Sequence, residues 1–317
     1  MERELIELER ELKDGSYRPG EYHQFIIHEP KERLISAAPF RDRVVHHAIH
    51  QVIEPIFDKR FIYDSYACRT GKGTHSAVRR FKQFLRHNSY VLKCDIWKYF
   101  PSIDHEILLN LIHRRIQDER LMRLIAVIVS NCPPDPLSME PHWFPGDELF
   151  SPLDRPRGIP IGNLTSQFFA NIYLHELDTF VKFELREKYY IRYVDDFVVL
   201  GNNKAHLHEV KTQISEFLQT LRLRLHPKKS IVFPVSVGTD FLGYRIYPTH
   251  TRIRRANVKR FIARTKRLQS DYACGNITLK KVRASIHSWL GHAKHADSYR
   301  LRRQLLNRFC FTRMRAY

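Results

Sequence analysis

Two adjacent aspartates, Asp195 and Asp196, lie between the short apolar runs IRY and FVVL. Like charges at a tight turn repel each other, so such a pair is costly unless a cation neutralises it. Carboxylate oxygens are hard ligands that favour Mg²⁺. Aspartate pairs also occur in solvated surface turns, but here both flanking runs have the composition of buried strands. This context favours a metal site.

A third acid, Asp95, ends the β-rich run 90–96 and is followed by the aromatic residues Trp97, Tyr99 and Phe100. An acid at a strand end is also a common cap, so Asp95 alone is ambiguous. Together with the pair it predicts that two strand ends converge and hold two metal ions about 3.5–4 Å apart, which activate a primer 3′-hydroxyl and stabilise the leaving pyrophosphate. The predicted metal ligands are therefore Asp95, Asp195 and Asp196, with two Mg²⁺ ions and Mn²⁺ as the alternative.

The hydrophobic periodicity supplies elements that can position these acids. A loop insertion is predicted at 131–157, which contains seven of the 16 prolines. Helices are predicted at 2–13 with Gly15 as its stop, at 41–57 with Pro55 as its end, and at 74–86, 165–185 and 205–221. Strands are predicted at 90–96, 190–193 and 197–200, with a further strand pair across 231–247.

Positive charge is concentrated at the C-terminal end. The 317 residues include 53 Lys+Arg and 34 Asp+Glu, a net charge of +19, and residues 248–317 alone contribute +16. A predicted helix at 254–268 places Arg255, Lys259 and other basic residues around an apolar stripe. This pattern suits binding to the phosphates of a duplex without sequence readout. A membrane surface is the alternative partner, but no lipidation motif supports it.

The remaining composition narrows the class of protein. The five cysteines include no CxxC pair, which is typical of a reducing cytoplasm and not of a disulfide framework or zinc finger. No apolar stretch approaches the ~20 residues of a membrane span. His46, His47 and His50 share one predicted helix, and His292 and His295 form an HxxH, but neither set has a third ligand or an HExxH glutamate. These histidines are expected in the core or at RNA.

Several motifs resemble those of reverse transcriptases. KCDIWKYFPSIDH, GIPIGNLTSQFFANIYL, RYVDDFVVL, LHPKKS and FLGY follow the order of that family's motifs A to E, and PFRDRVVHHAI and YACRTGKGTH resemble its fingers motifs. Within the family, IGNLTSQ and SWLGHAKHADSYRL resemble the enzymes of diversity-generating retroelements, which are group II intron-like bacterial reverse transcriptases. The resemblance implies an α+β right-hand fold with fingers, an antiparallel-sheet palm and a helical thumb. The implied domains are 1–90 for the N-terminal helix and fingers, 91–247 for the palm with a fingers insertion at about 106–157, and 248–317 for the basic thumb.

The resemblance also assigns roles to individual residues. Asp95, Asp195 and Asp196 match the catalytic acids, and Lys229, or else Lys228, matches a lysine that protonates the leaving pyrophosphate. The implied nucleotide-binding residues are Arg69 over the phosphates and base, Phe100 as the steric gate against a ribose 2′-hydroxyl, and Ile161 with Gly162 beneath the nucleotide. The implied template contacts are Ser166, Gln167, Arg255 and Lys259.

Ile161 departs from many relatives, which have Gln at this position near the nascent pair. The family implies errors opposite template adenines, and an isoleucine that cannot donate a hydrogen bond is a candidate cause; simple packing of Ile161 in the palm is the alternative.

The function implied is RNA-directed DNA synthesis in the cytoplasm from a cognate template RNA, with dNTPs, an RNA/DNA heteroduplex and a small basic pentameric accessory protein as partners. From the resemblance, a short N-terminal part of relatives is expected to be missing here, and no room is expected after the thumb for an RNase H, endonuclease or maturase domain.

Three alternatives stay open at this point. An antiviral-defence reverse transcriptase would use the same chemistry. An RNA-dependent RNA polymerase is disfavoured because that family's motif A has a second Asp where this chain has Phe100. A non-catalytic RNA-binding module is disfavoured because a mere binder gains nothing from burying three acids.

Overall fold

The computed structural model describes residues 2–28, 32–133 and 141–313. Part of the predicted insertion, 134–140, therefore lies outside the described residues. The chain forms two compact units, each built from several segments. The first unit comprises 1–73, 92–199 and 203–232, and the second comprises 74–91, 200–202 and 233–317.

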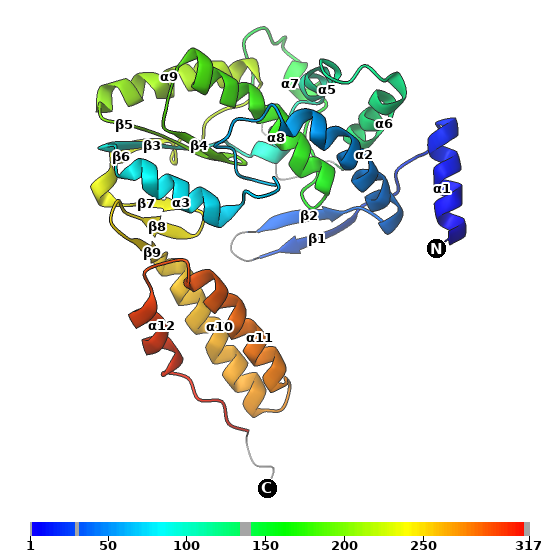
Figure 1. Cartoon of the computed structure of the whole chain (residues 1–317). Helices are drawn as coiled ribbons and strands as arrows, with labels where there is room; N and C mark the ends of the chain where they lie inside the picture. Colours follow the sequence, from blue (N-terminus) through cyan, green and yellow to red (C-terminus); the bar gives the residue numbers. More distant parts are fainter. Residues whose placement is uncertain (1, 29–31, 134–140, 314–317) are drawn as a thin grey trace. The chain divides into compact units, whose positions relative to one another are not determined.

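A four-stranded sheet with the order β4-β5-β3-β6 has most of its residues in the first unit (Figure 1). Its strands are β3 (Tyr90–Asp95), β4 (Tyr190–Tyr193), β5 (Asp196–Gly201) and β6 (Ile231–Pro234). Residues 197–200 of β5 are buried without interruption. A strand buried on both faces reads as a continuous apolar run, which is why FVVL shows no alternation.

Helix α8 (Leu164–Thr179) is the core helix of this unit and packs against α2 (Phe40–Asp58), α5 (His105–His113) and α9 (Lys204–Thr220). Residues 168–174 are all buried, so α8 has no solvated face along this stretch. It passes directly into a π-helical turn, η2 (Phe180–Glu184). The single helix predicted for 165–185 is therefore two segments of different geometry.

The sequence interpretation missed an N-terminal hairpin. Strands β1 (His23–Ile27) and β2 (Arg33–Ala37) pair antiparallel, with His23 opposite Ala37. The remaining helices of this unit are α1 (Glu2–Asp14), α4 (Tyr99–Ser102), α6 (Glu119–Ser130) and α7 (Ser151–Asp154).

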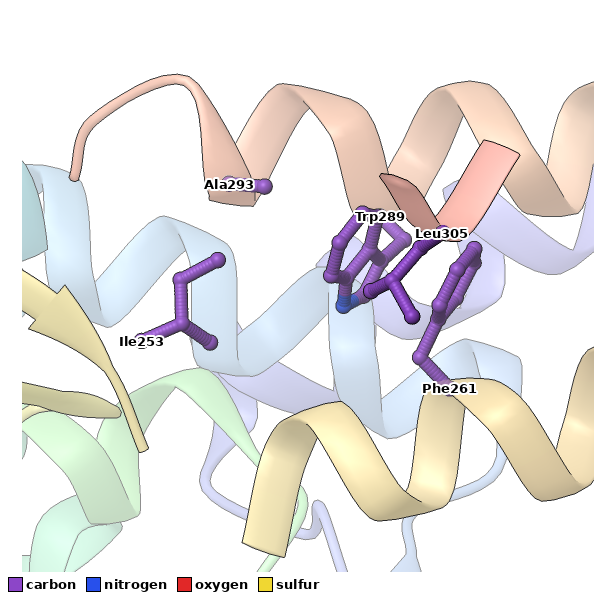
Figure 2. Packing of buried hydrophobic residues seen from close by; sticks show 5 residues of the cluster. All are labelled: Ile253, Phe261, Trp289, Ala293 and Leu305. Atoms are coloured by element: carbon purple, nitrogen blue, oxygen red, sulfur yellow. The ribbon is translucent and has the colours of Figure 1, made fainter. Parts of the chain in front are cut away.

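The second unit contains α3 (Thr74–Leu85), a three-stranded antiparallel sheet and three C-terminal helices. The sheet consists of β7 (Thr239–Phe241), β8 (Tyr244–Ile246) and β9 (Thr251–Ile253). The helices are α10 (Arg255–Ala273), α11 (Leu279–Ala293) and α12 (Tyr299–Leu306). Figure 2 shows their small core, in which the rings of Phe261 and Trp289 stack with centroids 3.8 Å apart.

Two predicted boundaries were wrong. Pro55 does not end α2, which continues to Asp58. Proline removes one helical hydrogen bond, but Ile53 and Phe57 are buried on either side of it and keep the last turn in the core. The strand pair expected across 231–247 is three strands, because the 3₁₀ turn η3 (Val235–Val237) separates β6 from β7.

The β7–β8 turn explains the FLGY motif. Leu242 and Gly243 both have positive φ, 48° and 91°. A two-residue hairpin loop of the mirror-image type needs positive φ at both central positions. Within the described residues, no helix is both long and apolar enough to cross a membrane.

Candidate active site

Asp195 lies in a tight turn between β4 and β5. These strands pair antiparallel, and Tyr193 is opposite Asp196, so Val194 and Asp195 are the two loop residues. Val194 has φ 55°, a conformation that β-branched residues rarely adopt. Primed two-residue turns require positive φ here and usually use glycine. The valine turn is thus strained, and surrounding contacts must hold it.

Asp95 and Asp196 meet at one edge of the sheet. Asp95 is the last residue of β3 and Asp196 is the first residue of β5, and these strands are neighbours. Two lysines lie beside these aspartates. Lys229 Nζ is 2.9 Å from Asp95 Oδ2, and Lys93 Nζ is 3.4 Å from Asp196 Oδ2. The structure therefore brings together the three acids predicted from sequence, and places Lys229 rather than Lys228 beside them.

The acids crowd one another electrostatically. Burial raises the pKa of Asp195, and the charge of Asp95 raises it further. Burial raises the pKa of Asp196 to about 6; Lys93 opposes this rise, while Asp195 and Asp95 add to it. Asp196 Oδ1 is buried and finds no hydrogen-bond donor among the described residues. A site with excess negative charge and an unsatisfied carboxylate oxygen is suited to a cation.

The acids do not form a closed metal cage. Across the described ranges, no three His, Cys, Asp or Glu side chains are arranged to hold a metal by themselves. Mg²⁺ usually binds one or two carboxylates together with waters and substrate phosphates. Three acids lie at one sheet edge, and two of them pair with lysines. This arrangement suits a Mg²⁺ ion that binds together with its substrate.

A buried ion pair holds the strained turn. Arg192 and Asp178 are both 0% exposed. The guanidinium group donates two hydrogen bonds to the carboxylate, with Nε–Oδ1 and Nη2–Oδ2 distances of 2.7 and 2.6 Å. Arg192 Nη1 also donates to the carbonyl oxygen of Val194 at 3.1 Å and to Asn171 Oδ1 at 3.0 Å. The arginine thus ties the turn of Asp195 to helix α8.

The sequence interpretation missed Arg192, Asp178 and Lys93. A signal for the pair was present, because Arg192 is a charged residue inside the apolar run YYIRYV. Charged residues are almost never fully buried unless paired. Its partner could not be read from spacing, since Asp178 is one of several acids in the helical segment before it. Lys93 carries no such signal.

The predicted nucleotide-binding residues occupy different settings. Arg69 is engaged within the protein: Nε is 2.6 Å from Asp58 Oδ1, and Nη1 donates to the carbonyl oxygens of Ile62 and Ser65. Contact with a nucleotide would require it to exchange some of these bonds, so this role stays a prediction. Phe100 is half-buried on α4, and its role as a gate also stays a prediction.

Ile161 and Gly162 lie against β2. The carbonyl oxygen of Ile161 accepts a hydrogen bond from the backbone N–H of Ser36 at 2.9 Å. Gly162 has φ 129°, and a Cβ there would lie 3.0 Å from Ile35 Cγ2. A side chain at this position would be strained by the positive φ and would crowd Ile35. Ile161 is half-buried and lines a cleft, so it is not sealed in the core.

The predicted template contacts differ in exposure. Ser166 is buried, whereas Gln167 is exposed and accepts from Cys68 Sγ at 3.1 Å. Arg255 and Lys259 are exposed on α10 in the second unit. These template roles stay predictions. Of the predicted histidines, His46 is buried and shares a hydrogen bond of 3.2 Å with Thr165 Oγ1.

Comparison with known families decides the class of protein. Residues 27–246 match the family described as reverse transcriptase (RNA-dependent DNA polymerase). The chain belongs to the reverse transcriptase family. This reverse transcriptase is 27% identical to Protein YkfC of Escherichia coli over 91% of its own length and 82% of YkfC. It is 24% identical to the group II intron-encoded protein LtrA of Lactococcus lactis, over 88% of its length and 54% of LtrA.

Solved structures support the right-hand polymerase fold expected from the sequence. Apo telomerase from Candida tropicalis aligns with a TM-score of 0.53 and 11% identity, covering 84% of this chain and 56% of that one. A Candida tropicalis telomerase bound to a fragment of telomeric RNA aligns with a TM-score of 0.53 and 13% identity, covering 90% and 56%. The reverse transcriptase thus spans about half the length of LtrA and of these telomerases.

The Arg192–Asp178 pair yields a stability prediction. Arg192→Met leaves the Asp178 carboxylate buried without its partner, and breaking a buried pair in this way costs about 3–5 kcal/mol. Arg114 provides a matched control, because it pairs at 3.5 Å with Glu176 on the same helix but is largely exposed. Arg114→Met should change stability by less than ~1 kcal/mol. Urea unfolding of both variants measures the difference, and equal losses would contradict the assigned role of Arg192.

Proposed function

We propose that this reverse transcriptase copies a template RNA into cDNA, using Asp95, Asp195 and Asp196 to hold two Mg²⁺ ions. The observation that supports this proposal is the meeting of Asp95 and the Asp195–Asp196 pair at one sheet edge, with a buried carboxylate oxygen unsatisfied. Bound ions of this kind activate a primer hydroxyl and stabilise charge on the leaving pyrophosphate. Substrates and partners are dNTPs, template RNA and the RNA/DNA heteroduplex.

The chain's own residues set the conditions for this chemistry. The strained turn presents Asp195, and Arg192 holds the turn through the Val194 carbonyl. Lys93 and Lys229 shield the carboxylates when no ion is bound, since each ammonium group lies on one of them. Lys229 then exchanges partners and donates a proton to the departing pyrophosphate.

We further propose that the biological role is mutagenic copying in a diversity-generating retroelement, aided by a small basic pentameric accessory protein. The support is the IGNLTSQ motif and the C-terminal SWLGHAKHADSYRL segment, together with an isoleucine whose half-buried side chain lines an open cleft. An antiviral-defence enzyme with the same chemistry is the competing role, and the neighbouring genes distinguish the two.

The catalytic proposal is tested by Asp195→Asn. Loss of a metal ligand should reduce primer extension by roughly 10³-fold or more, because metal stabilisation of the transition state is worth several kcal/mol. Binding of template–primer should stay near wild type, since the basic helices are unchanged. Asp154→Asn, at an exposed acid on α7, is the surface control. Extension by Asp195→Asn within tenfold of wild type would contradict the assignment.

The fidelity proposal is tested by Ile161→Gln. A hydrogen bond made only in a well-aligned nascent pair would add ~1 kcal/mol of discrimination, about a fivefold gain. Errors opposite template adenine should therefore fall more than errors opposite other bases. Ile161→Leu keeps the apolar contact and should leave the spectrum unchanged. The measurement is sequencing of cDNA made from one template by all three enzymes; an unchanged spectrum in Ile161→Gln would show that Ile161 only packs.

A further inference from the structure

Asn171 is a polar residue buried in the apolar middle of α8. It is 1% exposed, and the buried residues on either side of it, 168–170 and 172–174, are apolar or aromatic. A buried amide is costly unless its donor and its acceptor both find partners. Asn171 Nδ2 donates to the carbonyl oxygen of Ala67 at 2.8 Å, and Asn171 Oδ1 accepts from Arg192 Nη1 at 3.0 Å. The side chain therefore joins two segments that lie far apart in the sequence.

The bond to Arg192 completes the hydrogen bonding of that guanidinium group. Nε and Nη2 donate to the two oxygens of Asp178, and Nη2 also donates to Ser65 Oγ at 3.3 Å. Nη1 donates to the carbonyl oxygen of Val194 and to Asn171. Together these bonds use every N–H donor of the group. Because the donors are fixed in one planar fork, the bond to Asn171 helps to set the direction in which Nη1 meets the turn of Asp195.

The bond to Ala67 holds the base of a loop. Residues 66–73 form this loop, which carries Arg69. The backbone N–H of Gly73 donates to the carbonyl oxygen of Tyr66 at 2.9 Å and closes the loop. Ala67 is the first residue inside the closure, so the Asn171 amide binds the loop at the point where it begins.

The segment before the loop runs along β4, which is an edge strand of the four-stranded sheet. The backbone N–H of Arg192 donates to the carbonyl oxygen of Asp64 at 3.0 Å, and the backbone N–H of Tyr66 donates to the carbonyl oxygen of Arg192 at 3.0 Å. Ser65 thus pairs in parallel with Arg192. The loop 66–73 and the turn of Asp195 therefore leave the sheet from neighbouring backbone, and Asn171 binds both.

The amide group suits both partners at once. The carbonyl oxygen of Ala67 only accepts hydrogen bonds, and Arg192 only donates them. This fixes which way the amide of Asn171 points. A carboxylate at this position would satisfy the arginine alone, and an apolar side chain of similar size would satisfy neither partner. The two bonds of Asn171 are therefore separable by substitution.

We infer that Asn171 is a positioning residue that holds the loop 66–73 and the turn of Asp195 in one fixed relation. The inference rests on the proposed function, in which the loop contacts the nucleotide through Arg69 and the turn supplies a metal ligand. The bond to Ala67 keeps the loop ordered before the nucleotide binds. The bond to Arg192 keeps the turn in place during the reaction.

The test compares Asn171→Asp with Asn171→Leu in primer extension. Asn171→Asp keeps an acceptor for Arg192 but turns a second acceptor toward the carbonyl oxygen of Ala67. It should raise the KM for dNTP about tenfold and keep kcat within about threefold, because the nucleotide must then order the loop as it binds. Asn171→Leu loses both bonds and should also lower kcat by about tenfold or more, because a displaced metal ligand slows the reaction. An unchanged KM in Asn171→Asp, or equal kcat in the two variants, would overturn the inference.

Asn88 provides the matched control. It is 7% exposed, lies in the second unit, and its Nδ2 donates to the carbonyl oxygen of Phe84 at 2.8 Å. Asn88→Asp makes the same chemical change at a buried amide that donates to a backbone carbonyl. It should lower the free energy of unfolding and leave the KM for dNTP near wild type. A rise in KM equal to that of Asn171→Asp would show that the rise reflects lost stability, and would overturn the inference.

Hydrogen exchange supplies a readout that needs neither metal nor nucleotide. Exchange of the Gly73 amide should be about tenfold faster in both Asn171 variants, since both lose the bond that holds the base of the loop. Exchange of the turn amides, 193–196, should be faster only in Asn171→Leu. Turn amides that exchange equally in the two variants would overturn the inference.

If neither variant folds, native-state exchange of the wild type in urea decides. The Gly73 amide and the turn amides should then open together, with the same free energy and the same dependence on urea. A loop that opens without the turn would overturn the inference. These measurements stand even if the protein shows no primer extension, so failure of the inference is distinct from failure of the proposed function.

Discussion

The constraint on which this structure depends is the placing of three carboxylates side by side at one edge of a mostly buried sheet. Nothing in the apolar strands β3 and β5 favours this arrangement, and burial raises the pKa of both Asp195 and Asp196. The Arg192–Asp178 ion pair, which lies deeper in the unit, opposes this cost by holding the turn that carries Asp195. Arg192 and Asp178 are fully buried, and they satisfy each other while Arg192 also binds the carbonyl oxygen of the strained turn.

That pair also joins parts of the first unit that lie far apart in sequence. Tyr190 donates from its hydroxyl to Asp178 Oδ1 at 2.7 Å, and Asn171 Nδ2 donates to the carbonyl oxygen of Ala67 at 2.8 Å. The backbone of Arg192 exchanges hydrogen bonds with the segment 64–66, just before Arg69. A buried pair is weak evidence for net stability. The role of the pair here is to fix positions. Three parts of the unit meet at it: the segment leading to Arg69, helix α8 and the turn of Asp195.

The three aspartates could be predicted from the sequence because the unusual context of each one lies within a few residues of it. An aspartate pair between FVVL and IRY, and an aspartate at the end of VLKCD, are anomalies within a few residues. The same reasoning failed for Asp178, whose partner lies 14 residues away, and for the hairpin β1–β2, which has no strong alternation. Features set by the local sequence could be predicted, whereas features that depend on pairing between residues far apart in the sequence could not.

We propose that the carboxylate cluster destabilises the fold until a divalent ion joins it. Because the pKa of Asp196 is raised to about 6, the folded state binds more protons than the unfolded state between about pH 4 and 6, so this group lowers stability as pH rises through that window. About a quarter of its side chain is exposed, which reduces the effect to roughly 1–2 kcal/mol, below the ~3 kcal/mol that two pKa units would represent.

The most direct measurement is the free energy of unfolding of wild type and Asp196→Asn at pH 4 and pH 7.5, with and without Mg²⁺. The account predicts that Asp196→Asn is the more stable protein at pH 7.5 without metal. It also predicts that the gap closes at pH 4, and that Mg²⁺ narrows it at pH 7.5 by stabilising wild type, since an ion that binds only the folded state adds to its stability. A variant no more stable than wild type at pH 7.5, with no response of wild type to Mg²⁺, would contradict the account.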